Sequence, residues 1–320
     1  MKERVVSEQS LNDRRQGYGF ALAAALIWAG FIIVSRMGGM SELLAFDVIA
    51  IRYITCASIL LPIWWFKFRF NLFTPRLIIC SLIGGLAYAL CAFSGFQLAS
   101  ASHAAILLPG MMPLFIIVLS FLINKESHGW QKWLGISVIT FGVLVLFIGE
   151  LGLFGGNNSS VDINLMTLIG DGWLVAAAFL WALFSVLIKR WQITPWQVTV
   201  SLALLTCLFY LPVYLAFLPK AFSQASWADI LLQAFYQGIM ATIIQMIFYV
   251  KAVQKIGPSE MGAMMSIVPV ISGIAAIVIF DEQISEALII GLVLVSLGAW
   301  LAHSRLFKRK NMLNESLKIN

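Results

Sequence analysis

A positive charge lies where the surrounding sequence is almost entirely apolar. Arg52 falls inside the apolar run 45–66, which is long enough to cross a membrane as a helix. A cation inside such a helix is costly and by default indicates a functional site. The guanidinium could bind a substrate carboxylate through two hydrogen bonds. Alternatively, Arg52 follows Asp47 by five residues, so its side chain could reach outward or tie two helices together.

Polar side chains recur at a four-residue spacing in the apolar run 229–253. Gln233, Gln237, Gln245 and Tyr249 would share one face of a regular helix. Because lipid offers no hydrogen bonds, this face is predicted to point inward. Gln237, Gln245 and Tyr249 are candidates for a cavity wall that binds a polar substrate. Hydrogen bonds between helices, each worth about 1 kcal/mol or less, are the alternative.

Aromatic residues form a second candidate group. Trp28 and Trp181 lie in the middle of their apolar runs, away from the membrane interfaces where tryptophan is usually enriched. Together with Tyr88, Phe93 and Tyr249 they could form an aromatic box for planar or cationic groups. Ordinary packing between helices would use the same large rings.

Methionine and proline occur together at near-equivalent places in the two halves of the chain. Met112 and Met265 could supply a flexible wall for varied substrates, or could simply fill gaps. Pro113 and Pro269 each remove a backbone hydrogen bond and are predicted to bend their helices. Their symmetry makes them candidate hinges, with a static kink as the alternative.

Two titratable residues near the starts of apolar runs are candidates for proton coupling. Histidine titrates near neutral pH, so transport coupled to protons through His103 or Glu260 is one hypothesis. A first-turn acid also interacts favourably with the helix dipole, and Lys255 is close enough along the chain to pair with Glu260.

Apolar runs of about 20 residues predict membrane-spanning helices, and the chain contains ten of them. They cover residues 17–36, 45–66, 75–98, 102–123, 130–150, 166–188, 197–218, 229–253, 258–280 and 285–304. The Gly- and Asn-rich stretch before residue 165 is typical of a linker. The predicted organisation is a cytoplasmic tail (1–16), a first five-helix repeat (17–150), an external linker (151–165), a second five-helix repeat (166–304) and a basic cytoplasmic tail (305–320).

The two halves carry the same residue types at a constant offset of 156 residues. The matched pairs are Pro113 with Pro269, Glu126 with Glu282, Gly135 with Gly291, and Gly142 with Gly298. Internal repeats of this kind define the architecture of a chain. Since each half has an odd number of helices, the second must be inverted relative to the first, as in transporters whose site lies between the repeats.

Composition and charge argue against a soluble or nucleic-acid-binding protein. Hydrophobic residues make up 61% of the chain and charged residues 11%, whereas soluble domains are about 45–50% apolar. With the N-terminus inside, all but three of the 21 Lys and Arg residues fall in cytoplasmic segments; the exceptions are Arg36, Arg52 and Lys220. The predicted fold class is therefore an all-α integral membrane protein with ten transmembrane helices, an inverted repeat and cytoplasmic N- and C-termini.

Over residues 17–305 the chain resembles the EamA family of the drug/metabolite transporter superfamily. The residues that carry the resemblance are Ala25 with Trp28, Ala178 with Trp181, Arg52, the segments from Pro113 to Glu126 and from Pro269 to Glu282, and the Lys255-Ile256-Gly257 turn. The resemblance implies an inverted pair of five-helix units with both ends cytoplasmic. It also implies a central substrate cavity and movement of small metabolites, often amino acids and usually outward.

We expect a secondary transporter of small organic metabolites, with amino-acid or related metabolite export across the inner (plasma) membrane by alternating access as the preferred function. A multidrug or cationic compound exporter, and a sugar or lipid-linked-sugar translocator, are the alternatives. The isolated histidines and the absence of nucleophile or phosphate-loop motifs argue against an enzyme. No cofactor, metal or nucleic acid is expected. The expected partners are the substrate, membrane lipids and, as an open option, protons, with the chain a monomer or weak dimer.

Overall fold

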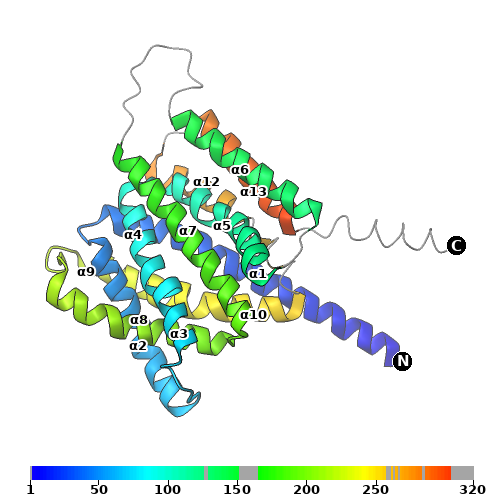
Figure 1. The fold of residues 1–320 in the computed structure, drawn as a ribbon, viewed down its shortest axis with the longest axis horizontal. Helices are drawn as coiled ribbons and strands as arrows, with labels where there is room; N and C mark the ends of the chain where they lie inside the picture. Colours follow the sequence, from blue (N-terminus) through cyan, green and yellow to red (C-terminus); the bar gives the residue numbers. More distant parts are fainter. Residues whose placement is uncertain are drawn as a thin grey trace, which may run out of the picture.

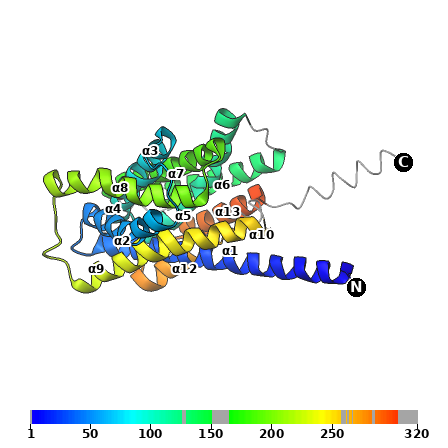
Figure 2. The same ribbon diagram turned by 90° about the horizontal axis from the view of Figure 1, so that it is seen from below.

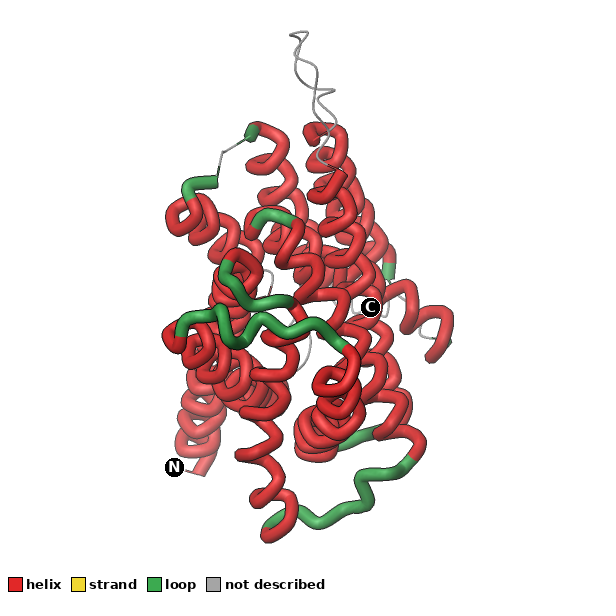
Figure 3. Tube along the Cα trace, turned by 90° about the vertical axis from the view of Figure 1, so that its left-hand side faces the viewer, coloured by secondary structure: helices red, strands yellow, loops and turns green. Residues whose placement is uncertain are grey.

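The computed structural model describes residues 2–125, 129–150, 165–256, 261, 264–265, 267–282 and 285–303. Over these residues the fold is helical throughout, without a strand, and short loops join the helices (Figure 3). By length and composition, seven of the described helices could cross a membrane, and three further apolar helices are shorter. Most of the predicted linker, and Glu260, lie outside the described residues.

The helices of the first half begin and end at recognisable sequence signals. The Ser100 hydroxyl accepts a hydrogen bond from the His103 amide at 3.1 Å, which caps the following helix. That helix ends at Lys125, whose φ of 54° lies in the left-handed region. The elements are α1 (Lys2–Met40), α2 (Ala45–Phe66), α3 (Pro75–Cys80), the π-helix η1 (Ser81–Ala87), α4 (Tyr88–Leu98), α5 (Ala101–Asn124) and α6 (Trp130–Glu150).

The second half shows the same kinds of signal. Thr194 and Gln197 form a capping box at the start of one helix, and Asp281, with φ of 52°, ends another. The elements are α7 (Leu165–Trp191), α8 (Pro195–Phe217), α9 (Trp227–Gln233), the π-helix η2 (Ala234–Ile244), α10 (Gln245–Ile256), α12 (Val268–Phe280) and α13 (Glu286–His303).

The structure differs from the sequence prediction at two helices. The helix predicted over 17–36 begins already at Lys2, because the polar tail continues it. The single helix predicted over 258–280 is wrong: Ile267 lies in a turn and α12 begins at Val268. Pro269 therefore occupies the first turn of α12, where a missing N–H leaves no hydrogen bond unmade, whereas Pro113 lies inside α5 as predicted.

Irregular features recur at the offset found in the sequence. Adding 156 to the bounds of η1 gives 237–243, which falls within η2. The left-handed residues Lys125 and Asp281 are also 156 apart. π-Helices are rare, and here two of them fall at positions that the 156-residue offset makes equivalent.

Helices of the two halves pack against each other in corresponding pairs. α1 packs on α10 and α4 on α7, while α2 packs on α8 and α5 on α12; Figure 2 shows α1 running beside α10. α6 and α13 form a close pair along one edge of the molecule (Figure 1). A Cβ on Gly135 would lie 2.7 Å from the Gly298 carbonyl oxygen, so these glycines permit the close approach.

Candidate functional site

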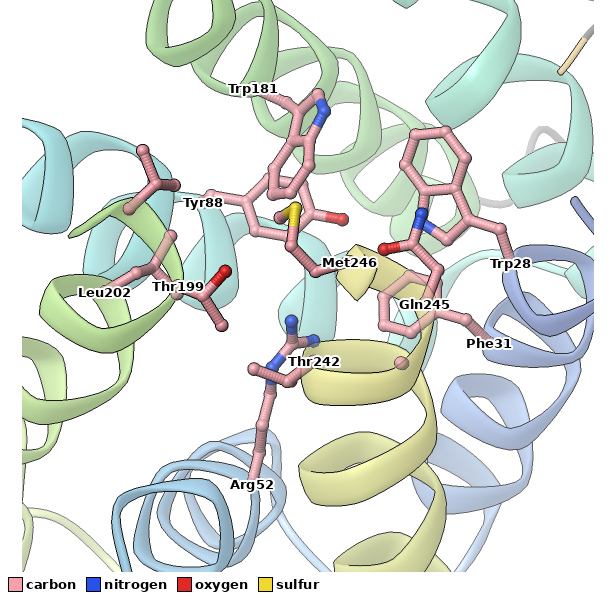
Figure 4. A pocket seen from close by; sticks show the side chains of 12 residues that line it. Trp28, Phe31, Arg52, Tyr88, Trp181, Thr199, Leu202, Thr242, Gln245 and Met246 are labelled. Carbon is pink, nitrogen blue, oxygen red and sulfur yellow. The ribbon is translucent and has the colours of Figure 1, made fainter. Parts of the chain in front are cut away.

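A cavity lies between the two halves and is lined from both. It is nearly filled by its own side chains, because only about 20 Å³ remains in which the centre of a water molecule can lie, enough for about one water. Figure 4 shows its lining side chains and labels most of them. The lining residues are Trp28, Phe31, Arg52, Tyr88, Trp181, Val198, Thr199, Leu202, Ala241, Thr242, Gln245 and Met246.

Arg52 points from α2 into the centre of this cavity (Figure 4). Its side chain does not reach outward, since only 5% of the residue is exposed. Its Nε and Nη1 atoms have no hydrogen-bond partner in the described part of the chain. The rings of Phe31, Tyr53 and Phe93 lie 5.6–5.9 Å from the guanidinium carbon. Ring faces attract a cation, but they leave its buried donors without acceptors.

Asp47, the partner that the sequence offered for Arg52, is engaged elsewhere. Its carboxylate accepts hydrogen bonds from the Leu44 amide at 2.9 Å, from the Ala221 amide at 3.1 Å and from the Tyr214 hydroxyl. These contacts join the start of α2 to the end of α8 and the loop that follows it. The guanidinium of Arg52 is thus left directed at the cavity.

The equivalent tryptophans of the two halves meet across the cavity. The ring centroids of Trp28 and Trp181 are 6.1 Å apart, and Tyr88 lies 4.8 Å from Trp181. The structure therefore brings together three members of the predicted aromatic box. Phe93 is buried beside Arg52 outside the lining, and Tyr249 is 36% exposed and also outside it.

The predicted glutamine face is divided by the π-helix. Gln245 lines the cavity, whereas Gln237 donates from Nε2 to Ser35 Oγ at 3.0 Å and Gln233 donates to the Val34 carbonyl at 2.8 Å. Because η2 winds more loosely than an α-helix, residues before and after it no longer share the face that four-residue spacing predicts. Gln237 and Gln233 accordingly bond to α1.

The two candidate methionines lie outside the cavity. Met112 is buried in the main core, and Met265 is half-buried against it. Met246 occupies the cavity wall instead. The structure therefore does not bring Met112 or Met265 into this cavity, and the lining methionine lies one helical turn after Thr242.

Sequence reasoning missed seven of the lining residues, namely Phe31, Val198, Thr199, Leu202, Ala241, Thr242 and Met246. Phe31 lies three residues after Trp28, and Met246 four after Thr242, so helical spacing from a residue already chosen would have found Phe31. Thr199 stands near the start of α8 with its hydroxyl bonded to the Pro195 carbonyl at 2.9 Å. Nothing in its sequence context distinguishes Thr199 from a packing residue.

His103 forms a buried pair that the sequence did not predict. Its Nδ1 lies 3.0 Å from Asp171 Oδ2, with 6% of the histidine and 0% of the aspartate exposed. The pair links α5 of the first half to α7 of the second. Glu282 approaches the same end of α5, where its carboxylate accepts from the Ala101 amide at 2.7 Å and the Ser102 amide at 2.9 Å.

Proteins with similar sequences are transporters by name. The uncharacterized transporter YetK of Bacillus subtilis is 24% identical over 307 residues, covering 91% of this chain and 88% of its own length. An uncharacterized transporter of Clostridium kluyveri is 26% identical over 302 residues, covering 91% of this chain and 94% of its own length. Both relatives are described as transporters, without a stated substrate.

A solved crystal structure shares the fold, with a TM-score of 0.61 at 21% identity over 89% of this chain and 97% of its own. The family model of the EamA-like transporters matches the chain twice, over residues 15–148 and 168–303. The family resemblance found in the sequence is thereby confirmed. With its many apolar helices, this chain is a multi-pass membrane protein, and it belongs to the EamA-like transporter family of the drug/metabolite transporter superfamily.

Proposed function

We propose that this protein transports small carboxylate-bearing metabolites, such as amino acids and related compounds, across the inner (plasma) membrane. The proposed direction is export. The observation that carries the proposal is the buried Arg52 guanidinium, with Nε and Nη1 unpartnered in the described part of the chain, directed at a cavity between Trp28 and Trp181. A buried cation is costly unless an anion accepts from it. A substrate carboxylate would supply that acceptor.

The proposed topology is ten membrane helices in two inverted five-helix repeats with both termini in the cytoplasm. The equivalent π-helices support the repeat. The packing pairs support the repeat as well. If the halves are exchanged, α1 corresponds to α7 and α10 to α4, so the pair α1–α10 becomes the pair α7–α4. The basic residues support the orientation, since they concentrate in the segments that this topology places inside.

The transport step in this proposal is alternating access to the cavity. Because the cavity has room for about one water, a metabolite can enter only if the halves separate on one side. Once inside, its carboxylate would pair with Arg52 and its body would lie between Trp28 and Trp181. Gln245, also in the lining, would offer an amide to a further polar group.

We further propose that the His103–Asp171 pair takes up a proton during transport. The pair spans the two halves, so separating them would change its protonation and its contacts. Glu282 and Arg36 are the other charged groups described nearby: Glu282 caps α5, and Arg36 is close enough to interact with it electrostatically. Glu260, the second proton candidate, lies outside the described residues.

Counterflow in proteoliposomes tests the transport function. Vesicles containing only this protein would be preloaded with unlabelled metabolites, and the entry of labelled tracer followed with and without a pH gradient. We expect tracer to accumulate with carboxylate-bearing compounds, and Arg52→Leu to abolish that accumulation. Arg69→Leu is the matched control, because Arg69 is an exposed cation remote from the cavity lining.

The same panel decides between substrate classes. Cationic drugs and sugars would be included, since an aromatic wall can also receive a cation. Accumulation with these compounds alone, unaffected by Arg52→Leu, would replace the carboxylate proposal with a drug or sugar exporter. Absence of counterflow with every compound, in protein shown to be folded, would overturn transport of small metabolites by this cavity.

A further inference from the structure

The charge of the cavity is not balanced by any lining residue. Of the lining residues that the structure describes, Arg52 alone carries a formal charge. The two fully buried carboxylates among the described residues are engaged elsewhere: Asp47 accepts from two amides and the Tyr214 hydroxyl, and Asp171 pairs with His103. The described cavity is thus a buried site with a single positive charge.

From this imbalance we infer that the cavity selects small organic acids that carry net negative charge, in preference to zwitterionic amino acids and to cations. The inference rests on the transport function proposed above and narrows its substrate class. A carboxylate placed at the guanidinium neutralises the site and satisfies its free donors. The flat or apolar body of the same acid would contact the rings of Trp28 and Trp181.

A zwitterion meets a less favourable site because its ammonium group also leaves water. That group needs acceptors or an anion. The described lining holds no anion and, besides its aromatic rings, offers the side-chain oxygens of Thr199, Thr242, Gln245 and Tyr88. The Thr242 hydroxyl already donates to the Gln237 carbonyl at 2.6 Å. A ligand that is only cationic meets like charge at close range in a region of low dielectric. The expected order of affinity is acid, then amino acid, then amine.

The test compares ligands that share the same apolar group and differ in charge: an acid, an amino acid and an amine. Isothermal titration calorimetry on the purified full-length protein would use 3-phenylpropionate, phenylalanine and 2-phenylethylamine, and a second set with an indole body and a third with a branched aliphatic body. In the set that binds, we expect the acid to bind at least about 10-fold more tightly than the amino acid, with no saturable binding of the amine. Counterflow with the same sets reports transport independently.

Arg52→Gln should remove the preference for the acid, while Arg69→Gln, which deletes a cation outside the cavity, should leave it intact. The inference is overturned if the amino acid or the amine binds as tightly as its matching acid, or if folded Arg52→Gln keeps the preference. The wild-type order alone decides the matter if that variant does not fold. Exchange of a zwitterion or a cation as fast as, or faster than, exchange of its matching acid would overturn this inference and leave the transport function standing. No binding and no exchange in any set would overturn both.

Discussion

Two buried charged side chains on α2, five residues apart, differ in their hydrogen bonding. Asp47 is 0% exposed and accepts three hydrogen bonds, two of them from backbone amides. Arg52 is 5% exposed and keeps two donor atoms without partners in the described part of the chain. The same helix thus carries one buried charge whose hydrogen bonds are made within the protein and another with donors that lack acceptors in the described residues.

The difference shows how burial can be used for structure or for function. A buried charge that loses its hydrogen-bond partners is strongly destabilising, so Asp47 depends on Tyr214 and Ala221, and they on it. In the described part of the chain the Nε and Nη1 donors of Arg52 have no acceptor, and aromatic rings lie beside the guanidinium. A protein that tolerates such a residue gains something from it elsewhere, and ligand binding is the role that the cavity offers.

The largest effect on stability is expected at Asp47. Asp47→Ala would leave the Ala221 and Leu44 amides and the Tyr214 hydroxyl without their acceptor. Since each buried donor left unsatisfied costs about 1–3 kcal/mol, we expect a loss of at least about 3 kcal/mol in the free energy of unfolding. Thermal unfolding of the purified protein in detergent measures it. Glu42→Ala, at an exposed acid just before α2, is the matched control, and equal effects of the two substitutions would contradict the structural role of Asp47.

Arg52→Gln should show the reverse pattern. We expect substrate exchange to fall about 10–100-fold, because each hydrogen bond to a charged group contributes about 1.5–3 kcal/mol. The melting temperature should stay the same or rise, since an unpaired buried cation is removed. Counterflow and thermal unfolding on the same preparation give both values. A melting temperature that falls as far as that of Asp47→Ala would make Arg52 a structural residue.

The sequence identifies the two charged residues of this comparison, but it does not predict which of them has hydrogen-bond partners. Arg52 was found because a cation in an apolar run is conspicuous, and Trp28 and Trp181 because they lie at equivalent mid-helix positions. The partners of Asp47 could not be found, since Tyr214 and Ala221 reach it only once α8 packs on α2. Sequence spacing therefore left open which of the two charges is satisfied.

The glutamine face failed for a local physical reason. Four-residue spacing assumes a regular α-helix, and the π-helix η2 interrupts it between Gln237 and Gln245. Gln237 turns to Ser35 while Gln245 faces the cavity. No residue in that stretch predicts a π-helix, and η2 packs against α1 and α2, whose positions the local sequence does not give.

The third prediction concerns Asp171, a buried acid that pairs with the side chain of His103. In Asp171→Asn we expect exchange at equal pH to persist, while accumulation driven by a pH gradient falls several-fold, because the proton-binding pair is gone. Asp229→Asn, which alters an exposed cap of α9, is the control. Unchanged gradient-driven accumulation in Asp171→Asn would leave the pair a structural contact between α5 and α7.

The smallest expected effect is a difference in stability loss between two neighbouring tyrosines of α8, one bonded to a charged acceptor and the other to a neutral one. The Tyr214 hydroxyl donates to the Asp47 carboxylate, whereas the Tyr210 hydroxyl donates to the Phe46 carbonyl at 2.8 Å. Both residues are buried, so Tyr→Phe changes little besides the hydrogen bond. We expect Tyr214→Phe to lower the free energy of unfolding by about 1.5–3 kcal/mol and Tyr210→Phe by about 0.5–1.5 kcal/mol. Equal losses would mean that the charge of Asp47 is stabilised mainly by the amides, and that the hydroxyl adds no more than it would to any carbonyl.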